Sequence, residues 1–327
     1  IYVAQRGKKL DANSFAEIIL ALPSDTTRAH IKSVSDLIDA GLNVVRSHQY
    51  IMLMGSAGCS PASRQAHGLK TAFRVMPNTM VEYTFFGESF FAPEIDEICI
   101  SNSTLSFDDY LECRLYDLTT EMFYNNAMFD ELYKFVERKG VLVSVLIQNI
   151  HEEIKETKGE LSKIRDEFLE ETRNLWRSEE DLIESLKNPI EIQRYIDGEK
   201  GLNEQVIFRT RAIFQHLPEL HRMAYDQAER LLSDAQQLTG TDKTYLAELR
   251  ELSLLRKSDV FSGHRSSKKK FHFDFKKLNN EDFKLDPIDC FSKNGIEVSV
   301  SHSVEQKKLI AQYKDQYGES EQSYGYI

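Results

Sequence analysis

The stretch that decides the fold is residues 15–54, FAEIILALPSDTTRAHIKSVSDLIDAGLNVVRSHQYIMLM. Its first segment, residues 15–22, is nearly all apolar, which is typical of a strand covered on both faces in a parallel sheet. At LALPSDT the apolar run stops at Pro23 and a helical pattern begins. This position leaves two interpretations, a plain strand-to-helix turn or the rim of an active site.

The helix that follows has its own start and stop signals. Asp25 or Thr26 can cap its first turn, apolar residues then recur at helical spacing, and Gly41 supplies a left-handed end. A second strand is predicted in NVVRSHQYIMLM, residues 43–54. The order strand, helix, strand predicts a βαβ unit.

The second strand has two unlike faces. Val45, Ile51 and Leu53 point one way, whereas Arg46, His48, Tyr50, Met52 and Met54 point the other. In a β/α barrel the inner wall points at the barrel axis, with the chemistry at the carboxyl ends of the strands, and a mixed face fits that wall. A third strand is predicted over residues 79–86. Three strands cannot close a barrel of eight, so either the fold is an open α/β layer or further strands lie upstream of Ile1.

Long helical patterns dominate after Pro93. Ser106 and Asp109 have the spacing of a capping box, and an apolar stripe runs from Tyr110 to the run VLVSVLI. Further helices are predicted over residues 160–187, 203–216, 219–238 and 245–256. Two alternating strands, FHFDFKKL and IEVSVSH, precede an amphipathic tail.

The predicted fold class is therefore α/β plus all-α. Residues 1–95 are predicted to form the C-terminal half of a TIM-like (β/α) barrel, residues 96–258 a helical domain, and residues 259–327 a small α/β module.

The composition limits the classes of function. The 327 residues are 41% hydrophobic and 28% charged, which is ordinary for a soluble globular protein. No apolar run reaches the roughly 18 to 20 residues of a membrane-spanning helix, and the first residues do not resemble a signal peptide. These features predict a cytoplasmic protein without a membrane partner. The net charge of −11 repels phosphate backbones, and the only sharp basic run is Lys268–Lys270, so nucleic acid is excluded as a partner.

Several runs along the chain together resemble one family. They are EIILALPSDT, DLIDAGLNVVRSHQYIMLMGS, GLKTAFRVMP, EYTFFGESF, SNSTLSFDDYLECR, YIDGEKGLNEQ and VSHSVEQKKLIAQYKDQYG. In this order they resemble the second half of the catalytic barrel, and the C-terminal region, of cobalamin-binding radical S-adenosylmethionine enzymes. The resemblance implies that the full enzyme cleaves S-adenosylmethionine reductively. With cobalamin, the resulting radical would drive methyl transfer or rearrangement on an unactivated carbon of a small-molecule substrate.

The resemblance also implies a role for the opening loop. In that family a strand of the type IxGLPGxT runs into a loop near the adenosine part of S-adenosylmethionine. The matching residues here are Ile19, Ala21, Leu22, Pro23, Ser24, Asp25 and Thr26. The two glycines are replaced by Ala21 and Ser24, whose Cβ atoms disfavour positive φ and narrow the space for a ligand. A plain turn remains the competing interpretation.

The loop and the mixed strand face together define a predicted cofactor-binding set. Its members are Glu17, Ala21, Pro23, Ser24, Arg46, His48, Gln49 and Tyr50. The last three lie where an inner-wall side chain can touch adenosine or substrate, and ordinary buried core positions are the alternative. Arg46 needs either a carboxylate, for which Glu17 is a candidate, or an anionic ligand. No catalytic residue is assigned.

The family's iron site has no match in this chain. A [4Fe–4S] cluster is held there by CxxxCxxC, because thiolates suit iron clusters. Cys59, Cys99, Cys113 and Cys290 are too widely and irregularly spaced for that motif, for a disulfide framework, or for a local metal site. The cobalamin module that precedes the barrel in the family also has no counterpart. The chain is therefore not expected to run the radical reaction alone.

Two explanations for the unmatched iron site remain. In the first, an N-terminal half of the same protein, upstream of Ile1, carries the cluster and the cobalamin. In the second, the protein is degenerate or split and keeps its helical region as a non-catalytic interaction module or scaffold.

Overall fold

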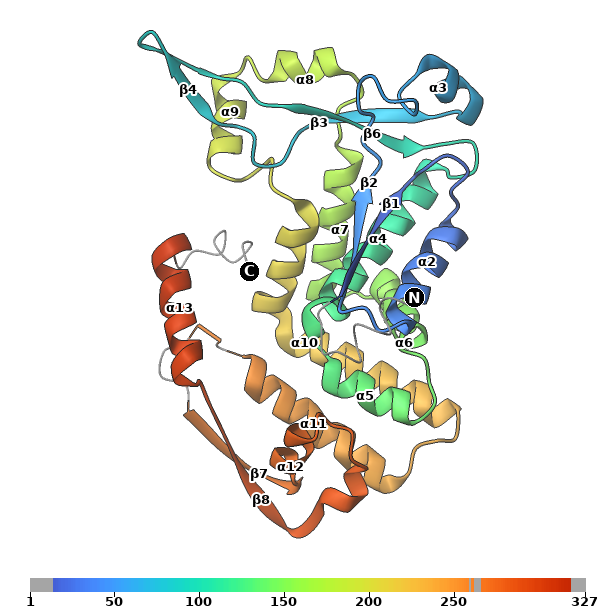
Figure 1. Cartoon of the computed structure of the whole chain (residues 1–327), viewed down its shortest axis with the longest axis vertical. Coiled ribbons are helices and arrows are strands. Elements are labelled where there is room, and N and C mark those ends of the chain that lie inside the picture. Colours follow the sequence, from blue (N-terminus) through green and yellow to red (C-terminus); the bar gives the residue numbers. More distant parts are fainter. Residues whose placement is uncertain (1–13, 259, 262–265, 319–327) are drawn as a thin grey trace. The chain divides into compact units, whose positions relative to one another are not determined.

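A computed structural model describes residues 14–258, 260–261 and 266–318 of the chain (Figure 1). Within these residues the fold is mixed α/β, with twelve α-helices and eight strands. The described strands pair as four two-stranded sheets, and none of these sheets closes into a barrel. The mixed α/β character predicted from the sequence is thereby confirmed.

The chain forms two compact units. The first unit contains Ile1–Glu121 and Lys163–Arg209, and the second contains Met122–Ser162 and Thr210–Ile327. The units therefore alternate along the sequence, whereas the three predicted domains are consecutive segments. That predicted division stays a prediction.

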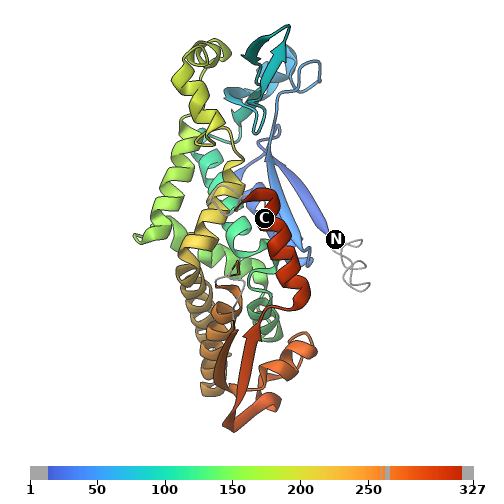
Figure 2. The ribbon, with the colours of Figure 1, turned by 90° about the vertical axis from the view of Figure 1, so that its left-hand side faces the viewer.

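The predicted βαβ unit is present at the start of the first unit. Strand β1 (Phe15–Leu20), helix α2 (Thr27–Asp39) and strand β2 (Val44–Gln49) follow one another. The two strands are parallel and lie side by side in both views of the ribbon (Figure 1 and Figure 2). The Thr26 hydroxyl caps α2 by accepting a hydrogen bond from the Ala29 N–H at 3.1 Å. Local signals were therefore sufficient to predict this unit.

The β1–β2 sheet has one covered face and one open face. Val45 and Ser47 are buried, whereas Arg46 and His48 are exposed, as the alternation predicts. The prediction that β1 is covered on both faces is wrong, because Phe15 remains 72% exposed.

The predicted third strand does not join β1 and β2. It is β4 (Glu82–Phe85), which pairs antiparallel with β5 (Glu88–Phe91) in a hairpin. Phe86 and Gly87 connect the strands, and both have positive φ, 50° and 85°, as a type I′ turn requires. Every residue from 81 to 90 is exposed, so this hairpin adds no strand to the β1–β2 sheet.

A further strand pair was not predicted. Strands β3 (Lys70–Val75) and β6 (Ile95–Ser101) are antiparallel. Strand β6 also meets the segment after β2, through hydrogen bonds from the Met52 N–H to the Glu97 carbonyl (2.8 Å) and from the Cys99 N–H to the Tyr50 carbonyl (2.9 Å). This junction is antiparallel, whereas every strand pair of a β/α barrel is parallel.

The core of the first unit gathers around the ends of β1 and β6. Its buried members are Leu20, Ala21, Met52, Ala72, Ile98, Cys99, Ile100, Leu105, Tyr110 and Cys113. Burial raises the pKa of the Cys99 thiol to about 11 and raises that of Cys113 further, so both remain neutral thiols. These two cysteines pack in the core and are unsuited to act as thiolate ligands.

Helix α4 (Phe107–Phe123) begins where the capping box predicts. The Asp109 N–H donates to the Ser106 hydroxyl at 3.1 Å, and the Ser106 N–H donates to the Asp109 carboxylate at 3.0 Å. The first unit also contains α3 (Pro61–His67), most of α7 (Glu160–Arg173), α8 (Glu179–Ser185) and α9 (Pro189–Ile196).

The helix predicted over residues 160–187 is divided between α7 and α8. Trp176 lies in the break and forms an isolated bridge with Phe73 of β3, with N–H to carbonyl distances of 2.8 and 2.9 Å in the two directions. Residues 174–178 give up helical hydrogen bonds for this long-range pair, which a local periodicity cannot reveal.

The second unit is mainly helical. It contains α5 (Asp130–Arg138), α6 (Val143–Glu156), most of α10 (Glu204–Asp234), α11 (Gly240–Lys257) and short 3₁₀ helices at Asn125–Ala127 and Pro287–Cys290. The two helices predicted over residues 203–238 form the single element α10, which bends at His216 (φ −128°) just before Pro218. The break predicted between two helices is therefore a kink within one helix.

The C-terminal part of the second unit differs in part from the prediction. Of the predicted strand FHFDFKKL, residues 271–273 end a strand, whereas residues 275–278 begin a short helix that was not predicted. Strand β7 (Ser266–Phe273) pairs antiparallel with β8 (Phe291–Ser301), with α12 (Phe275–Asn280) between them and α13 (Val304–Tyr317) after them.

No helix in the described ranges has both the length and the apolar composition needed to cross a membrane.

Candidate functional site

The loop that follows β1 has an unusual backbone. The Asp25 N–H donates to the Leu22 carbonyl at 3.0 Å, which closes a turn with Pro23 and Ser24 at its centre. Ser24 has φ +70°, so the turn has the form of type II, with proline at its second position. Ala21, the last residue before the turn, also has φ +70°.

These two left-handed residues occupy the positions at which the resembled family has glycine. A left-handed conformation costs a residue with a Cβ about 1–2 kcal/mol, whereas glycine adopts it freely. The sequence predicted that Ala21 and Ser24 would disfavour positive φ, yet both adopt it. The backbone shape typical of a glycine loop is therefore present without the glycines, and other contacts must hold it.

The Asp25 carboxylate supplies part of that support. One oxygen accepts from the Ala21 N–H at 3.2 Å, and the other accepts from the Thr26 N–H at 2.9 Å. The carboxylate therefore braces the loop from inside, between the end of β1 and the start of α2. In the sequence Asp25 was considered as a possible helix cap and as one position of the matched motif, but not as a support of the loop.

We predict that Ser24→Gly stabilises the protein by about 0.5–1 kcal/mol. Glycine removes the left-handed cost but adds conformational freedom to the unfolded chain, and the first effect is the larger. The matched control is Ser33→Gly, because Ser33 is also exposed but lies within α2. Replacing serine by glycine inside a helix lowers stability by about 0.5 kcal/mol, so urea denaturation should give shifts of opposite sign. Shifts of the same sign would contradict this account of Ser24.

The loop borders a hollow of about 620 Å³ between β1 and α2. Its lining residues are Glu17, Ile18, Ile19, Leu22, Pro23, Ser24, Asp25, His30, Ser33, Asp36 and Leu37. Carboxylates and hydroxyls therefore stand beside an apolar wall, an arrangement that suits a small molecule with hydrogen-bond donors and a flat apolar part. Three predicted site residues, Glu17, Pro23 and Ser24, meet at this hollow.

His30 is a member of this lining that sequence reasoning missed. It is 2% exposed, and its Nε2 lies 2.7 Å from a carboxylate oxygen of Asp117 on α4, which is 3% exposed. Burial alone lowers the pKa of His30, but the charge of Asp117 and the hydrogen bond to it outweigh burial and raise the pKa above 6.5. No hydrogen-bond partner for the buried Nδ1 is found among the described residues.

The open face of the sheet holds three predicted residues in a different pairing from the expected one. Glu17 lies opposite Arg46 in the strand register, but its carboxylate is 3.1 Å from Nε2 of His48. Arg46 instead approaches Glu121 of α4, at 3.7 Å. The expected Glu17–Arg46 pair is therefore wrong, because Arg46 turns toward the buried carboxylate.

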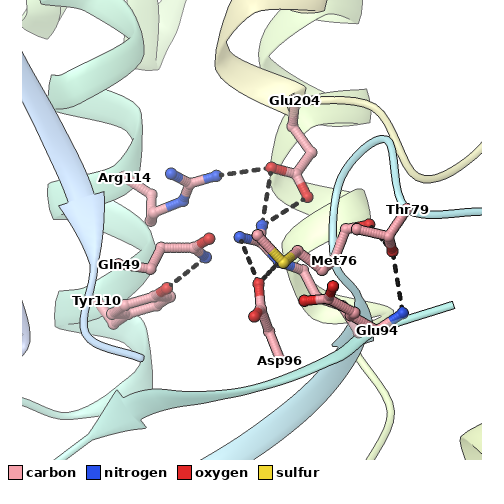
Figure 3. Close-up of polar contacts among 9 residues, drawn as sticks. Gln49, Met76, Thr79, Glu94, Asp96, Tyr110, Arg114 and Glu204 are labelled. Atoms are coloured by element: carbon pink, nitrogen blue, oxygen red, sulfur yellow. Dashed lines mark hydrogen bonds and ion pairs between the residues drawn. The ribbon is translucent and has the colours of Figure 1, made fainter. Parts of the chain in front are cut away.

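Gln49 belongs to the covered side of the sheet. Its amide donates to the Tyr110 hydroxyl at 2.8 Å, and Tyr110 is fully buried on α4 (Figure 3). Tyr50 is half-buried against the core, and its hydroxyl lies close to Gly58. A Cβ built on residue 58 would stand 1.8 Å from this hydroxyl. Both residues pack the end of β2 against its surroundings, and a Cβ at residue 58 would require the Tyr50 hydroxyl to shift.

A charged network lies near Gln49 and Tyr110 (Figure 3). Arg114 of α4 is 3% exposed and lies 3.6 Å from the Glu204 carboxylate. The same carboxylate accepts from Arg74 of β3 at 3.2 Å, and Arg74 also reaches Asp96 of β6 at 3.4 Å. The network joins β3 and β6 to α4 and to the first turn of α10, all within the first unit, which suits a supporting role for the site.

The predicted set therefore divides among three places. Pro23 and Ser24 line the hollow, Arg46 and His48 lie on the open face, and Glu17 belongs to both. Ala21, Gln49 and Tyr50 are packed inward. His30, Asp117 and Arg114 were not predicted as site residues. The only sequence signal for His30 was its place four residues before Val34, on the buried stripe of α2.

No protein-family model matches this chain, and no curated protein matches it.

Proposed function

We propose that this chain is the C-terminal part of a cobalamin-dependent radical S-adenosylmethionine enzyme. The enzyme would transfer a methyl group to, or rearrange, an unactivated carbon of a small molecule. The observation that carries the proposal is the loop after β1, in which Ala21 and Ser24 both have φ +70°. These residues stand where the resembled IxGLPGxT motif has its glycines, at the carboxyl end of a parallel strand.

The residues beside the loop fit the nucleoside part of S-adenosylmethionine. Ribose hydroxyls and the adenine amino group are donors, and the carboxylates of Glu17 and Asp36 line the hollow as acceptors. Ile19, Leu22 and Pro23 offer apolar surface for a planar base.

The residues of this chain do not fit the iron cluster. Three closely spaced thiolates are required, whereas the cysteines are far apart in the sequence. Burial also raises the pKa of three of them, Cys99, Cys113 and Cys290. The proposal therefore includes a partner that supplies the cluster and the cobalamin, namely an N-terminal half of the same protein. We assign no step of the reaction to residues of this chain.

The open face of the sheet supports such a partner. On this face Phe15 and Ile19 of β1 are 72 and 45% exposed, and in the segment after β2 Leu53 and Met54 are 64 and 98% exposed. A sheet face with this much exposed apolar surface is typical of an interaction site. A further β/α segment whose strand pairs with an open edge of the two-stranded β1–β2 sheet would extend this sheet toward a barrel.

A non-catalytic interaction protein is the second candidate. It is favoured by Ile183, Ile190 and Ile196, which are 46, 72 and 46% exposed on or beside α8 and α9. In this case the helices, and not the loop after β1, would bind the partner.

We expect the full-length gene product to form 5′-deoxyadenosine. It is to be produced without oxygen, reconstituted with iron and sulfide, reduced and supplied with S-adenosylmethionine. Product should accumulate only when the cluster is loaded, and protein without added iron and sulfide is the control. No product from a fully loaded cluster would contradict the proposal and leave the interaction protein as the better account.

A further inference from the structure

The side chain of Asn102 joins β6 to the loop after β1. Asn102 directly follows β6 and is 9% exposed. Its Nδ2 donates to the Leu22 carbonyl at 2.9 Å and approaches the Ala21 carbonyl at 3.5 Å. Its Oδ1 accepts from the backbone N–H groups of Thr104 and Leu105, at 2.9 and 3.0 Å. The Asn102 amide therefore makes hydrogen bonds through both its nitrogen and its oxygen, and it links segments about 80 residues apart in sequence.

Thr104 makes a second contact with the same loop. Its hydroxyl lies 2.6 Å from the Asp25 carbonyl and 2.9 Å from Asn102 Oδ1. The segment itself is fixed, because Asn102 and Leu105 form an isolated bridge and the Ser103 N–H donates to the His67 carbonyl at 2.8 Å. Asn102 and Thr104 thus form a rigid clamp on the loop, and we call this pair the Asn102 clamp.

The loop requires such a clamp. Ala21 and Ser24 hold left-handed conformations that a residue with a Cβ leaves readily, so the surroundings must maintain them. Asp25 braces the loop from inside through its N–H groups, whereas the Asn102 clamp acts from outside on its carbonyls. With both supports the loop is shaped before any ligand arrives, which reduces the free energy cost of binding.

We infer that Asn102 is a positioning residue that holds the left-handed loop in the shape needed to bind S-adenosylmethionine. The choice of ligand rests on the proposed function. The other component of the inference, that Asn102 holds the loop in place, rests only on the contacts described above.

The test uses Asn102→Asp in the full-length protein. This change removes the Nδ2 donor but keeps an oxygen for the N–H groups of Thr104 and Leu105. Hydrogen exchange at the Ala21 and Thr26 amides should become about tenfold faster, while the Tyr50 amide, bonded to the Leu20 carbonyl, should not change. In the reconstituted enzyme, KM for S-adenosylmethionine in 5′-deoxyadenosine formation should rise about tenfold, with kcat within about twofold.

Two further variants separate positioning from general damage. Adding Ser24→Gly to Asn102→Asp should restore most of the KM, because glycine holds φ +70° with less help. Asn43→Asp is the matched control. Asn43 lies just before β2, and within the described part of the chain its side chain makes hydrogen bonds only through Oδ1, to Ser14. This variant should leave both exchange at the loop and KM unchanged.

The outcomes are distinguishable. Unchanged exchange at Ala21 and Thr26 in Asn102→Asp, or equally faster exchange at Tyr50, overturns the inference whatever the activity. A fall in kcat without a change in KM overturns it too. A wild-type enzyme that forms no 5′-deoxyadenosine overturns the proposed function and the ligand named here, while the exchange rates still decide whether Asn102 holds the loop.

Discussion

Replacing His30 by phenylalanine should lower the free energy of unfolding by about 3–5 kcal/mol. The reason is that Asp117 would remain buried without its partner. Asp117 is 3% exposed, and His30, 2.7 Å away, is the residue that shares its charge. An uncompensated buried carboxylate costs far more than the lost contact itself, because it gives up water and receives nothing in return.

The control for this prediction is the double variant His30→Phe with Asp117→Ala. It removes both charged groups and nearly conserves the total side-chain volume, so most of the lost stability should return. Urea denaturation of the three proteins supplies the measurement. If the double variant is as unstable as the single one, packing around the imidazole, and not the unpaired carboxylate, would explain the loss.

The His30–Asp117 pair also makes the free energy of unfolding depend on pH. The pKa of His30 is raised above 6.5 in the folded protein, with Asp117 and, more weakly, Asp25 as the charges responsible. A raised folded-state pKa means that the folded state binds the proton more tightly. Its contribution is therefore complete below about pH 6.5 and is lost as the pH rises through the folded-state value. Wild type should lose stability over this range relative to the double variant.

Sequence reasoning succeeded where hydrogen bonds are local. The caps at Thr26 and Ser106 and the alternation in β2 depend on neighbours within a few residues, and they placed the βαβ unit and the start of α4. It failed where a distant partner decides the structure. The division between α7 and α8 depends on a bridge from Trp176 to Phe73, about a hundred residues away.

The candidate site follows the same rule. The loop after β1 was found through its resemblance to a glycine motif. Its two supports differ in how far they lie from the loop in sequence. Asp25 lies within the loop, whereas Asn102 reaches it across 80 residues. His30 and Asp117 are separated by 87 residues, so no spacing in the sequence reveals that they form a pair. Only the folded chain shows which polar residues share a buried position.

Replacing Glu121 by leucine is the second change with a large expected effect, again about 3–5 kcal/mol. Glu121 is 5% exposed at its side chain and lies 3.5 Å from Arg209, whose side chain is 7% exposed. Without this carboxylate the buried guanidinium of Arg209 loses its counter-charge. Its Nε already has no hydrogen-bond partner among the described residues, so little remains to compensate the charge.

Arg46→Met provides the matched comparison, because Arg46 approaches the same carboxylate from the open face of the sheet. Its side chain is 47% exposed and the N···O distance is 3.7 Å, so water screens the pair and the loss should not exceed about 1 kcal/mol. Urea denaturation of Glu121→Leu, Arg209→Met and Arg46→Met is the measurement. The first two variants should have a clearly lower free energy of unfolding than the third. An equal cost for Arg46→Met would mean that Arg46 is the main partner of Glu121. Arg46 would then serve the stability of the sheet and would not be free to meet an anionic ligand.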